Sequence, residues 1–554
     1  MSTSDGSLFQ QCSAVAGDSD PSRILQCVSD ALETNQNDRA ADLNNWFLII
    51  AGALVFFMQS GFAMLCAGCV RKKNVQNTML KNLLDACGAA LGFYVIGYAL
   101  AFGGQNERSD VTFVGTTDFF NWNSAVPVNQ AFWFFEFAFS ATSVTIVAGT
   151  LAERCQMVAY LCYSVFLTGF VYPVVAHSIW SNNGFLSAFA AEPFQGIGVL
   201  DFAGSGVVHV TGGTTALVAT YMLGARKGRF YDARGRELEK PKAFPGHSMA
   251  LQMMGTMILW FGWYGFNPGS ALLLTATSNT GGVAALAAVN TSLSAASGAV
   301  SALFTSLYLE ERKTGEYSFN ITMAMNGALA GLVGITAGCG TVENWAACCT
   351  GLVSGWVYIF GSAFLLRIKI DDAVDAIPVH MFCGAWGLIA TGLFSSPRHT
   401  LEAFGTDAHV GWFYSLGQDS LDAILLMNQL LGLLFILGWS AILMSPFFWW
   451  LNYMGWLRAD SLEELVGLDQ AYHGGREAGE GFDDEVPFAT SKDKPDTLRR
   501  RKGGNSAEGT RDDGSWTDLT ASAPRETAPL PELYCENDAS SKESDDDPSG
   551  MHHA

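Results

Sequence analysis

The sequence predicts an all-α protein that crosses a membrane many times. Hydrophobic residues make up 49% of the 554 residues, charged residues only 15%, and the mean hydropathy is +0.21. A soluble protein of this length would be expected to divide into several domains and to carry more charge. The net charge of −21 argues against nucleic acid as a partner.

Eleven apolar stretches are long enough to cross the roughly 30 Å hydrocarbon core of a bilayer as helices of about 20 residues. They lie near residues 45–66, 83–104, 130–152, 156–177, 200–224, 247–268, 282–308, 319–338, 342–366, 375–395 and 422–450. The polar, acidic residues 1–44 contain no apolar core of a signal peptide. We therefore expect eleven transmembrane helices.

The lysines and arginines between these stretches indicate the orientation. Sixteen of them follow odd-numbered stretches, whereas only Arg108 and Arg398 follow even-numbered ones. Cytoplasmic loops are enriched in basic residues, so the odd-numbered connections are expected in the cytoplasm. The N-terminus is then outside, and the C-terminus is cytoplasmic.

Two segments share a spacing of aspartate and histidine. Asp201 precedes His209 by eight residues, and Asp372 precedes His380 by eight residues. Eight residues of helix rise about 12 Å, so histidines that start from opposite faces of the membrane end near its midplane. The first ten helices would then form an inverted five-plus-five helix repeat, followed by an eleventh helix.

A single histidine in a membrane helix is about as often a hydrogen-bonded link between helices as a functional group. Two histidines at matching positions of a repeat favour function. The pair could line a conduction path, or it could hold a haem iron from both sides. The sequence lacks the several paired histidines that are typical of two-haem bundles, which favours conduction.

Trp180 and Ser270 lie at the outer ends of the fourth and sixth stretches. An indole face attracts cations, and a hydroxyl can accept hydrogen bonds from them, so the two residues suit an entrance for a small cation. Tryptophan is also common wherever membrane helices meet water, and either residue alone would be weak support.

Several motifs together resemble one family. They are Arg71–Val75, Gly149–Arg154, Asp201–Gly213, Gly262–Ser270 and Asp371–Gly387. These motifs closely resemble those of the ammonium transporter, methylammonium permease and Rhesus superfamily, in particular its eukaryotic ammonium-transporter branch. The resemblance covers about residues 45–475. It implies a homotrimer in the plasma membrane, with one pore and eleven helices in each subunit.

The resemblance implies roles for individual residues at the outer end of the pore. Trp180, Ser270 and Phe135 would form the external ammonium-recruitment site. Phe139 and Phe266 would form a stacked phenyl gate below that site.

Further along the implied pore, His209 and His380 would be the twin histidines. Asp201 would be the acidic residue that supports recruitment and the pore architecture. Glu136 stands where many relatives have glutamine, which could change the electrostatics beside the outer gate.

The implied function is ammonium uptake. A dry, gated pore makes a bare cation costly, so ammonium would lose a proton and ammonia would pass the histidines, with the proton expected to follow. The alternatives are a neutral gas channel of the Rhesus type, disfavoured by Trp180 together with Ser270, and an ammonium sensor with little flux. Membrane lipid is the other expected partner; no enzymatic activity, cofactor or metal is expected.

The resemblance and the composition also divide the chain. Cys12 and Cys27 lie in the external segment and could form a disulfide within or between subunits. The expected parts are an extracellular N-terminal segment at 1–44, the membrane domain at 45–455, a cytoplasmic regulatory segment at 456–480, and a disordered acidic tail containing serine and threonine at 481–554.

Overall fold

The structure, a computed structural model, describes residues 8–16, 21–105, 110–122, 128–275, 280–416 and 421–473. Throughout these ranges the regular secondary structure is helical, and β pairing is limited to isolated bridges. The prediction of an all-α protein is therefore confirmed for the described part of the chain. The tail predicted at 481–554 lies outside the described residues, as does the end of the segment 456–480.

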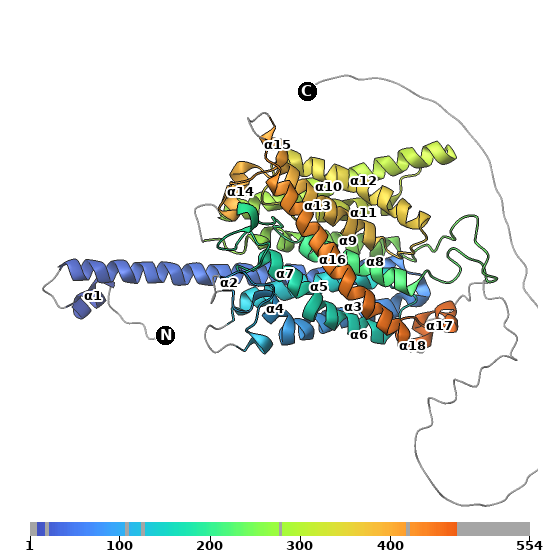
Figure 1. Cartoon of the computed structure of the whole chain (residues 1–554), viewed down its shortest axis with the longest axis horizontal. Coiled ribbons are helices and arrows are strands. Elements are labelled where there is room, and N and C mark those ends of the chain that lie inside the picture. The colour runs from blue at the N-terminus through green and yellow to red at the C-terminus, as the bar shows by residue number, and fades with distance from the viewer. Residues whose placement is uncertain are drawn as a thin grey trace, which may run out of the picture. The chain divides into compact units, whose positions relative to one another are not determined.

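Many of the helices in the described ranges lie side by side in one bundle (Figure 1). The α-helices are α1 (Leu8–Ala16), α2 (Pro21–Cys69), α3 (Val75–Gly92), α4 (Tyr98–Phe102), α5 (Gln130–Thr150), α6 (Met157–Phe166), α7 (Tyr172–Trp180), α8 (Thr211–Leu223), α9 (Met249–Phe266), α10 (Thr280–Thr314), α11 (Ile321–Ile335), α12 (Asn344–Arg367), α13 (Cys383–Phe394), α14 (Pro397–Phe404), α15 (Trp412–Ser415), α16 (Ile424–Tyr453), α17 (Ser461–Val466) and α18 (Leu468–His473).

Each predicted apolar stretch coincides with helix in the structure. Among the described residues, eight helical segments are long and apolar enough to cross a membrane, judged by length and composition. The segments that contain α8, α9 and α11 are not among these eight, and α11 has only 15 residues. The structure thus supports a membrane fold of many helices, while the number eleven remains a prediction from the sequence.

Four helical segments of the described part of the chain contain a turn of π-helix. These turns are η2 (Phe93–Gly97) between α3 and α4, η4 (Leu167–Val171) between α6 and α7, η6 (Ser205–Val210) before α8, and η8 (Ile377–Phe382) before α13. π-Turns are rare in proteins, and those that occur often lie at functional sites. The turns η6 and η8 contain His209 and His380, so both predicted histidines lie in π-helical rather than α-helical turns.

Helix α5 lies inside the bundle, packed against α2, α3, α8 and η6. Every residue from Phe135 to Thr150 is buried, as expected for a helix that other helices surround. It begins at Gln130 because Asn129 Oδ1 accepts hydrogen bonds from the amides of Ala131 and Phe132, which forms an N-cap. The side chains of α5 are therefore held from all sides.

Glycines let some helix pairs approach very closely. A Cβ atom at Gly61 of α2 would lie 2.8 Å from Leu259 Cγ of α9. A Cβ atom at Gly355 of α12 would lie 2.8 Å from the Gly298 carbonyl oxygen of α10. Small residues at these contacts allow backbone to pack against backbone, as is common between membrane helices.

Helix α2 begins well before the apolar stretch predicted at 45–66. Its first half is polar but continues the same 49-residue helix, and it extends beyond the neighbouring helices (Figure 1). Alanine and leucine each occur three times among residues 21–44, and arginine and glutamine each occur twice; all four favour helix apart from any membrane. A disulfide joins Cys12 of α1 to Cys27 of α2, so the two cysteines pair within one chain.

Candidate functional site: stacked phenylalanines and paired histidines

Three phenylalanine rings from α5 and α9 pack together inside the bundle. They belong to a file of rings in contact, which runs from Trp180 through Phe139 and Phe266 to His209 and His380. The rings of Phe139 and Phe266 are stacked, with centroids 4.1 Å apart and planes 17° apart. Phe135 lies one helical turn from Phe139, with ring centroids 4.7 Å apart. All three side chains are buried. The structure thus brings together Phe139 and Phe266, which were predicted for the gate, and packs against them Phe135, which was predicted for the recruitment site.

The predicted entrance residues lie next to this block. Trp180, the last residue of α7, meets Phe139 edge to face at 5.9 Å, and its Nε1 donates a hydrogen bond to the Asp201 carbonyl (2.7 Å). Ser270 lies in the short 3-10 helix η7 (Pro268–Ala271) directly after α9, where its hydroxyl donates to the Phe266 carbonyl (2.8 Å). Both side chains are half-buried, so the entrance groups are anchored by polar contacts and remain partly accessible.

The two predicted histidines are in direct contact beyond the phenyl block. Nδ1 of His209 lies 3.2 Å from Nδ1 of His380, with ring planes 22° apart. The His209 ring is stacked on Trp263 at 5.2 Å and lies 5.5 Å from the Phe266 ring. Both histidines are buried, at 0% and 5% exposure. A hydrogen bond between two Nδ1 atoms requires one donor and one acceptor.

The aspartates of the paired motif cap the turns that carry the histidines. Asp201 accepts hydrogen bonds from the amides of Gly204, Gly206 and Val207 at 2.8–2.9 Å. Asp372 accepts from the amides of Val374 (3.2 Å) and Ile377 (2.7 Å). A carboxylate stabilises the positive end of a helix. The repeated spacing in the sequence therefore corresponds to a repeated local structure.

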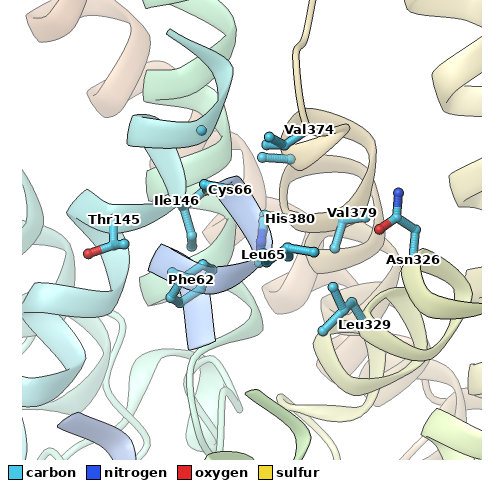
Figure 2. A pocket seen from close by; sticks show the side chains of 12 residues that line it. Phe62, Leu65, Cys66, Thr145, Ile146, Asn326, Leu329, Val374, Val379 and His380 are labelled. Atoms are coloured by element: carbon cyan, nitrogen blue, oxygen red, sulfur yellow. The ribbon is translucent and has the colours of Figure 1, made fainter. Parts of the chain in front are cut away.

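A largely apolar cavity lies against His380, at the end of the file. Its lining comes from α2, α5, α11 and the segment before α13 and consists of Phe62, Leu65, Cys66, Thr145, Ile146, Gly149, Asn326, Leu329, Val374, Ala376, Val379 and His380. Figure 2 shows His380 in the middle of this lining, close to Leu65 and Val379. The Thr145 hydroxyl donates to Gln59 Oε1 (2.6 Å), so this part of the wall offers few free polar groups.

Buried ion pairs lie in the connections at one end of the bundle, apart from the file. Asp371 binds Arg226 through both carboxylate oxygens at 2.8 and 2.9 Å, and Glu153 accepts from Arg71 Nε at 2.7 Å. Burial by itself would raise the pKa of Asp371, but its hydrogen bonds with Arg226 and the charges of Arg154 and Arg226 hold that pKa below the ordinary value. These ion pairs hold the connecting loops together, and their charges lie outside the file.

The segment after α16 packs against the same end of the bundle within one chain. Glu464 of α17 accepts hydrogen bonds from Arg458 (2.8 Å) and from the Lys227 amide (2.6 Å). Asp469 of α18 accepts from the amides of residues 76 and 77 at the start of α3. The segment predicted as regulatory therefore touches a loop of the membrane domain and the first turn of α3.

The haem alternative does not fit the histidine geometry. Metal–nitrogen bonds of about 2.0–2.1 Å would hold two nitrogens on opposite sides of an ion roughly 4 Å apart, whereas the Nδ1 atoms are 3.2 Å apart. Among the described residues no group of three or more histidine, cysteine, aspartate or glutamate side chains could hold a metal ion. The pair is therefore suited to hydrogen bonding.

Residues 46–478 match the sequence profile of the Ammonium Transporter Family. The chain belongs to this family. Ammonium transporter 1 member 1 of Oryza sativa subsp. japonica is 42% identical over 422 residues, which cover 74% of this chain and 81% of that protein. Ammonium transporter Amt2 of Archaeoglobus fulgidus is 40% identical over 428 residues, which cover 77% and 86%.

Solved structures of ammonium transporter relatives share the fold. The protein named Sensor Amt Protein superposes with a TM-score of 0.66 at 30% identity, over 79% of this chain and 99% of that chain. Mep2 of Candida albicans superposes with a TM-score of 0.64 at 28% identity, over 77% and 87%. The relatives from Oryza sativa and Archaeoglobus fulgidus are named as ammonium transporters, and this chain is a membrane-spanning protein of the same family.

The sequence analysis missed two aromatic residues that lie next to the histidine pair. Trp263 fixes the ring plane of His209, and Phe62 lies 6.1 Å from the His380 ring. Trp263 lies within the motif Gly262–Ser270, so the motif gave a usable signal. Phe62 carried none, because an aromatic residue in an apolar helix is commonplace.

We expect Asp201→Asn to destabilise the protein. An amide has one acceptor oxygen and cannot replace a carboxylate that accepts three backbone hydrogen bonds, which leaves buried N–H groups unsatisfied at a cost of about 1.5–3 kcal/mol. The measurement is the thermal unfolding midpoint of the purified protein, with the exposed Asp407→Asn as control. Equal midpoints for the two variants would contradict the capping role.

Proposed function

We propose that this chain is an ammonium uptake transporter. It recruits NH4+ at an aromatic site, removes a proton and conducts NH3 past the paired histidines with net transfer of H+. The observation that carries the proposal is the stacked Phe139–Phe266 pair, which lies between Trp180 and His209 in a chain of the ammonium transporter family.

The proposed topology has eleven transmembrane helices in an inverted five-plus-five repeat and an eleventh helix. The one-sided distribution of lysine and arginine supports an N-terminus outside and a C-terminus in the cytoplasm. The matching roles of Asp201 and Asp372 as helix caps support the repeat. In this orientation Trp180 lies at the outer end of the file, and the cavity behind His380 lies on the cytoplasmic side.

Ammonium is recruited by Trp180, Ser270 and Phe135. The indole is held in place through its hydrogen bond to the Asp201 carbonyl, so that its face attracts the cation. The Ser270 hydroxyl already donates its proton, which leaves its oxygen as an acceptor for an N–H of ammonium. These contacts replace part of the water shell of the ion.

The stacked rings of Phe139 and Phe266 determine what passes. They are buried and offer no hydrogen-bond acceptor, so a cation between them loses hydration without gaining a partner. Ammonium can avoid this cost because it can release a proton and continue as ammonia. Potassium has no proton to lose, which provides selectivity between two ions of similar size.

Beyond the gate, His209 and His380 supply hydrogen-bond partners for ammonia. Their mutual contact holds the rings in place, and the apolar cavity beyond them favours a neutral molecule. We propose that the proton released at the gate follows ammonia inward, so that uptake moves charge. The neutral channel of the Rhesus type differs from this proposal only in returning that proton to the outside.

The setting proposed for the transporter is a homotrimer in the plasma membrane, in contact with lipid. Residues 1–44 would be extracellular and residues 45–455 would form the membrane domain. Residues 456–480 would be a cytoplasmic regulatory segment, which the contacts of Glu464 and Asp469 with the membrane domain support. The acidic tail predicted at 481–554 lies outside the described residues.

An ammonium sensor is the second candidate. The observation that favours it is the similarity to the solved structure of the protein named Sensor Amt Protein, at 30% identity over 79% of this chain. A sensor would bind ammonium at the same entrance and would pass little of it.

The test of the proposed function is a current measurement on liposomes that contain the purified protein. An ammonium pulse is expected to give an inward current, and a matched potassium pulse is expected to give none. Internal alkalinisation without current would favour the neutral channel. The absence of both a current and internal alkalinisation after the ammonium pulse would favour the sensor.

We expect His209→Leu to reduce ammonium flux by roughly tenfold or more, because a buried hydrogen-bond partner worth about 1–3 kcal/mol is lost. The measurement is uptake per protein at the cell surface. The exposed His247→Leu serves as the control and should leave uptake unchanged. Full uptake by the His209 variant at normal surface expression would exclude His209 from the conduction path.

We expect Trp180→Leu to weaken capture at low substrate concentration. A cation–π contact of about 0.5–2 kcal/mol corresponds to a rise in the half-saturation concentration of roughly two- to thirtyfold. The measurement is the concentration dependence of uptake, with Trp122→Leu, at 81% exposure, as the control. The recruitment role is wrong if both variants keep the half-saturation concentration of the unmodified protein.

A further inference from the structure

Glu136 is a buried acid beside the stacked phenylalanines. It follows Phe135 and precedes Phe139 by three residues, so it lies on the same turn of α5 as both rings. Its side chain is 4% exposed, and Oε2 has no hydrogen-bond partner among the described residues. An unpaired carboxylate in such surroundings is costly, so Glu136 is stabilised when a proton or a cation is close to it.

Other buried acids of the bundle already have partners. Asp201 accepts three backbone hydrogen bonds. Asp371 and Glu153 are paired with arginines, and Asp85 accepts a hydrogen bond from a tyrosine hydroxyl. Within the described residues, Glu136 has neither an arginine nor a lysine in an ion pair. It is therefore the acid beside the gate that is least committed to holding the fold.

Tyr172 lies level with Glu136 on the neighbouring helix. The segment from α6 to α7 runs antiparallel to α5, and the hydrogen bond from Tyr160 Oη to the Ala148 carbonyl (2.7 Å) sets the register. Twelve residues onward from Tyr160 and twelve residues back from Ala148 lead to Tyr172 and Glu136. Tyr172 is 0% exposed, and its hydroxyl also has no partner within the described ranges.

Tyr172 lies in α7, the same helix that ends at the predicted entrance residue Trp180. The Trp180 indole is held by its hydrogen bond to the Asp201 carbonyl. A phenol hydroxyl can accept one proton while it donates another. Helix α7 thus carries both Trp180 and a phenol hydroxyl at the level of Glu136, a group that can hold a proton.

We propose that Glu136 accepts the proton that ammonium loses at the gate, through the Tyr172 hydroxyl, and that it thereby sets the charge moved with each ammonia. The inference rests on the proposed function and deepens it. An N–H bond of ammonium breaks, and its electron pair stays on nitrogen. The Tyr172 oxygen takes that proton and passes its own proton to the Glu136 carboxylate. The products are ammonia, an unchanged phenol and a carboxylic acid, which releases its proton inward.

Trp133 provides a matched control on the same helix. It lies one turn before Glu136, and its Nε1 is likewise buried without a partner in the part of the chain that the structure describes. Its ring is stacked on Phe137 at 5.6 Å. An indole N–H donates a hydrogen bond but cannot accept a proton and pass one on. Trp133→Phe therefore removes a buried polar atom without cutting the proposed route.

The experiment compares charge with substrate in liposomes that contain the full-length protein. Uptake of isotope-labelled ammonium and the current are measured on the same preparation for the unmodified protein, Glu136→Gln and Trp133→Phe. Glutamine keeps the size of the side chain but cannot take up the proton. We expect about one elementary charge per ammonium without substitution. The ratio should fall roughly twofold or more in Glu136→Gln and should be unchanged in Trp133→Phe.

Tyr172→Phe is the second variant, because it keeps the acid and removes only the relaying hydroxyl. Its ratio of charge to ammonium is expected to fall as well. Normal uptake with an unchanged ratio in both variants overturns the role of Glu136. Where Glu136→Gln fails to assemble, the ratio of Tyr172→Phe decides.

The same data separate this inference from the proposed function. Uptake of label without current by the unmodified protein overturns the electrogenic proposal, and this inference with it, before any variant is compared. The absence of both uptake and current overturns transport itself. A current that is normal in the unmodified protein and unaltered per ammonium in the variants leaves the transporter in place and removes only Glu136 and Tyr172 from the proton route.

Discussion

The contact between Nδ1 of His209 and Nδ1 of His380 depends on two helical segments that cross with almost no space between their backbones. A Cβ atom at Gly213 would lie 2.5 Å from the Met381 amide nitrogen, and one at Gly384 would lie 2.6 Å from the Ser205 carbonyl oxygen. Each segment that carries a histidine therefore places a glycine against the backbone of the other. A methyl group at either glycine would push the segments apart and break the histidine contact, so the centre of the fold and the site have the same steric requirement.

The distribution of polar groups along the file bears on which molecules or ions could pass through it. Arginine and acid side chains are paired with one another in the connections, as with Arg226 and Asp371, while the rings of Phe139 and Phe266 and the cavity beyond His380 are nearly free of polar groups. In the proposed mechanism, a cation at the entrance would have an indole and a hydroxyl as partners but would have none between the rings. Because the lost hydration would not be replaced there, the barrier would act on the charge of the ion rather than on its size.

Much of this arrangement follows from the sequence, and the part that does not has physical reasons. Apolar stretches fix where helices lie, and the eight-residue spacing of Asp201 and Asp372 from their histidines corresponds to equivalent caps. The π-turns around His209 and His380 were not predicted, because the choice between i→i+4 and i→i+5 bonding depends on tertiary packing. The helix in the polar first half of α2 was not predicted, because that part of the sequence has no apolar period from which a helix could be recognised. The family resemblance predicted that Trp180 and Phe139 lie in neighbouring parts of one site. No local sequence pattern could have predicted that Tyr172 lies level with Glu136.

The histidine contact also couples the protonation of the two rings. If Nδ1 of His209 donates, Nδ1 of His380 must accept, and the opposite assignment is equally consistent with the 3.2 Å distance. A neutral ring with a proton on Nδ1 has an acceptor at Nε2, and its partner then has a donor at Nε2. The pair therefore always presents one donor and one acceptor to a third molecule. Ammonia both donates and accepts hydrogen bonds, so it matches this pair in either state, whereas a cation that has no N–H bond can use only one half of it.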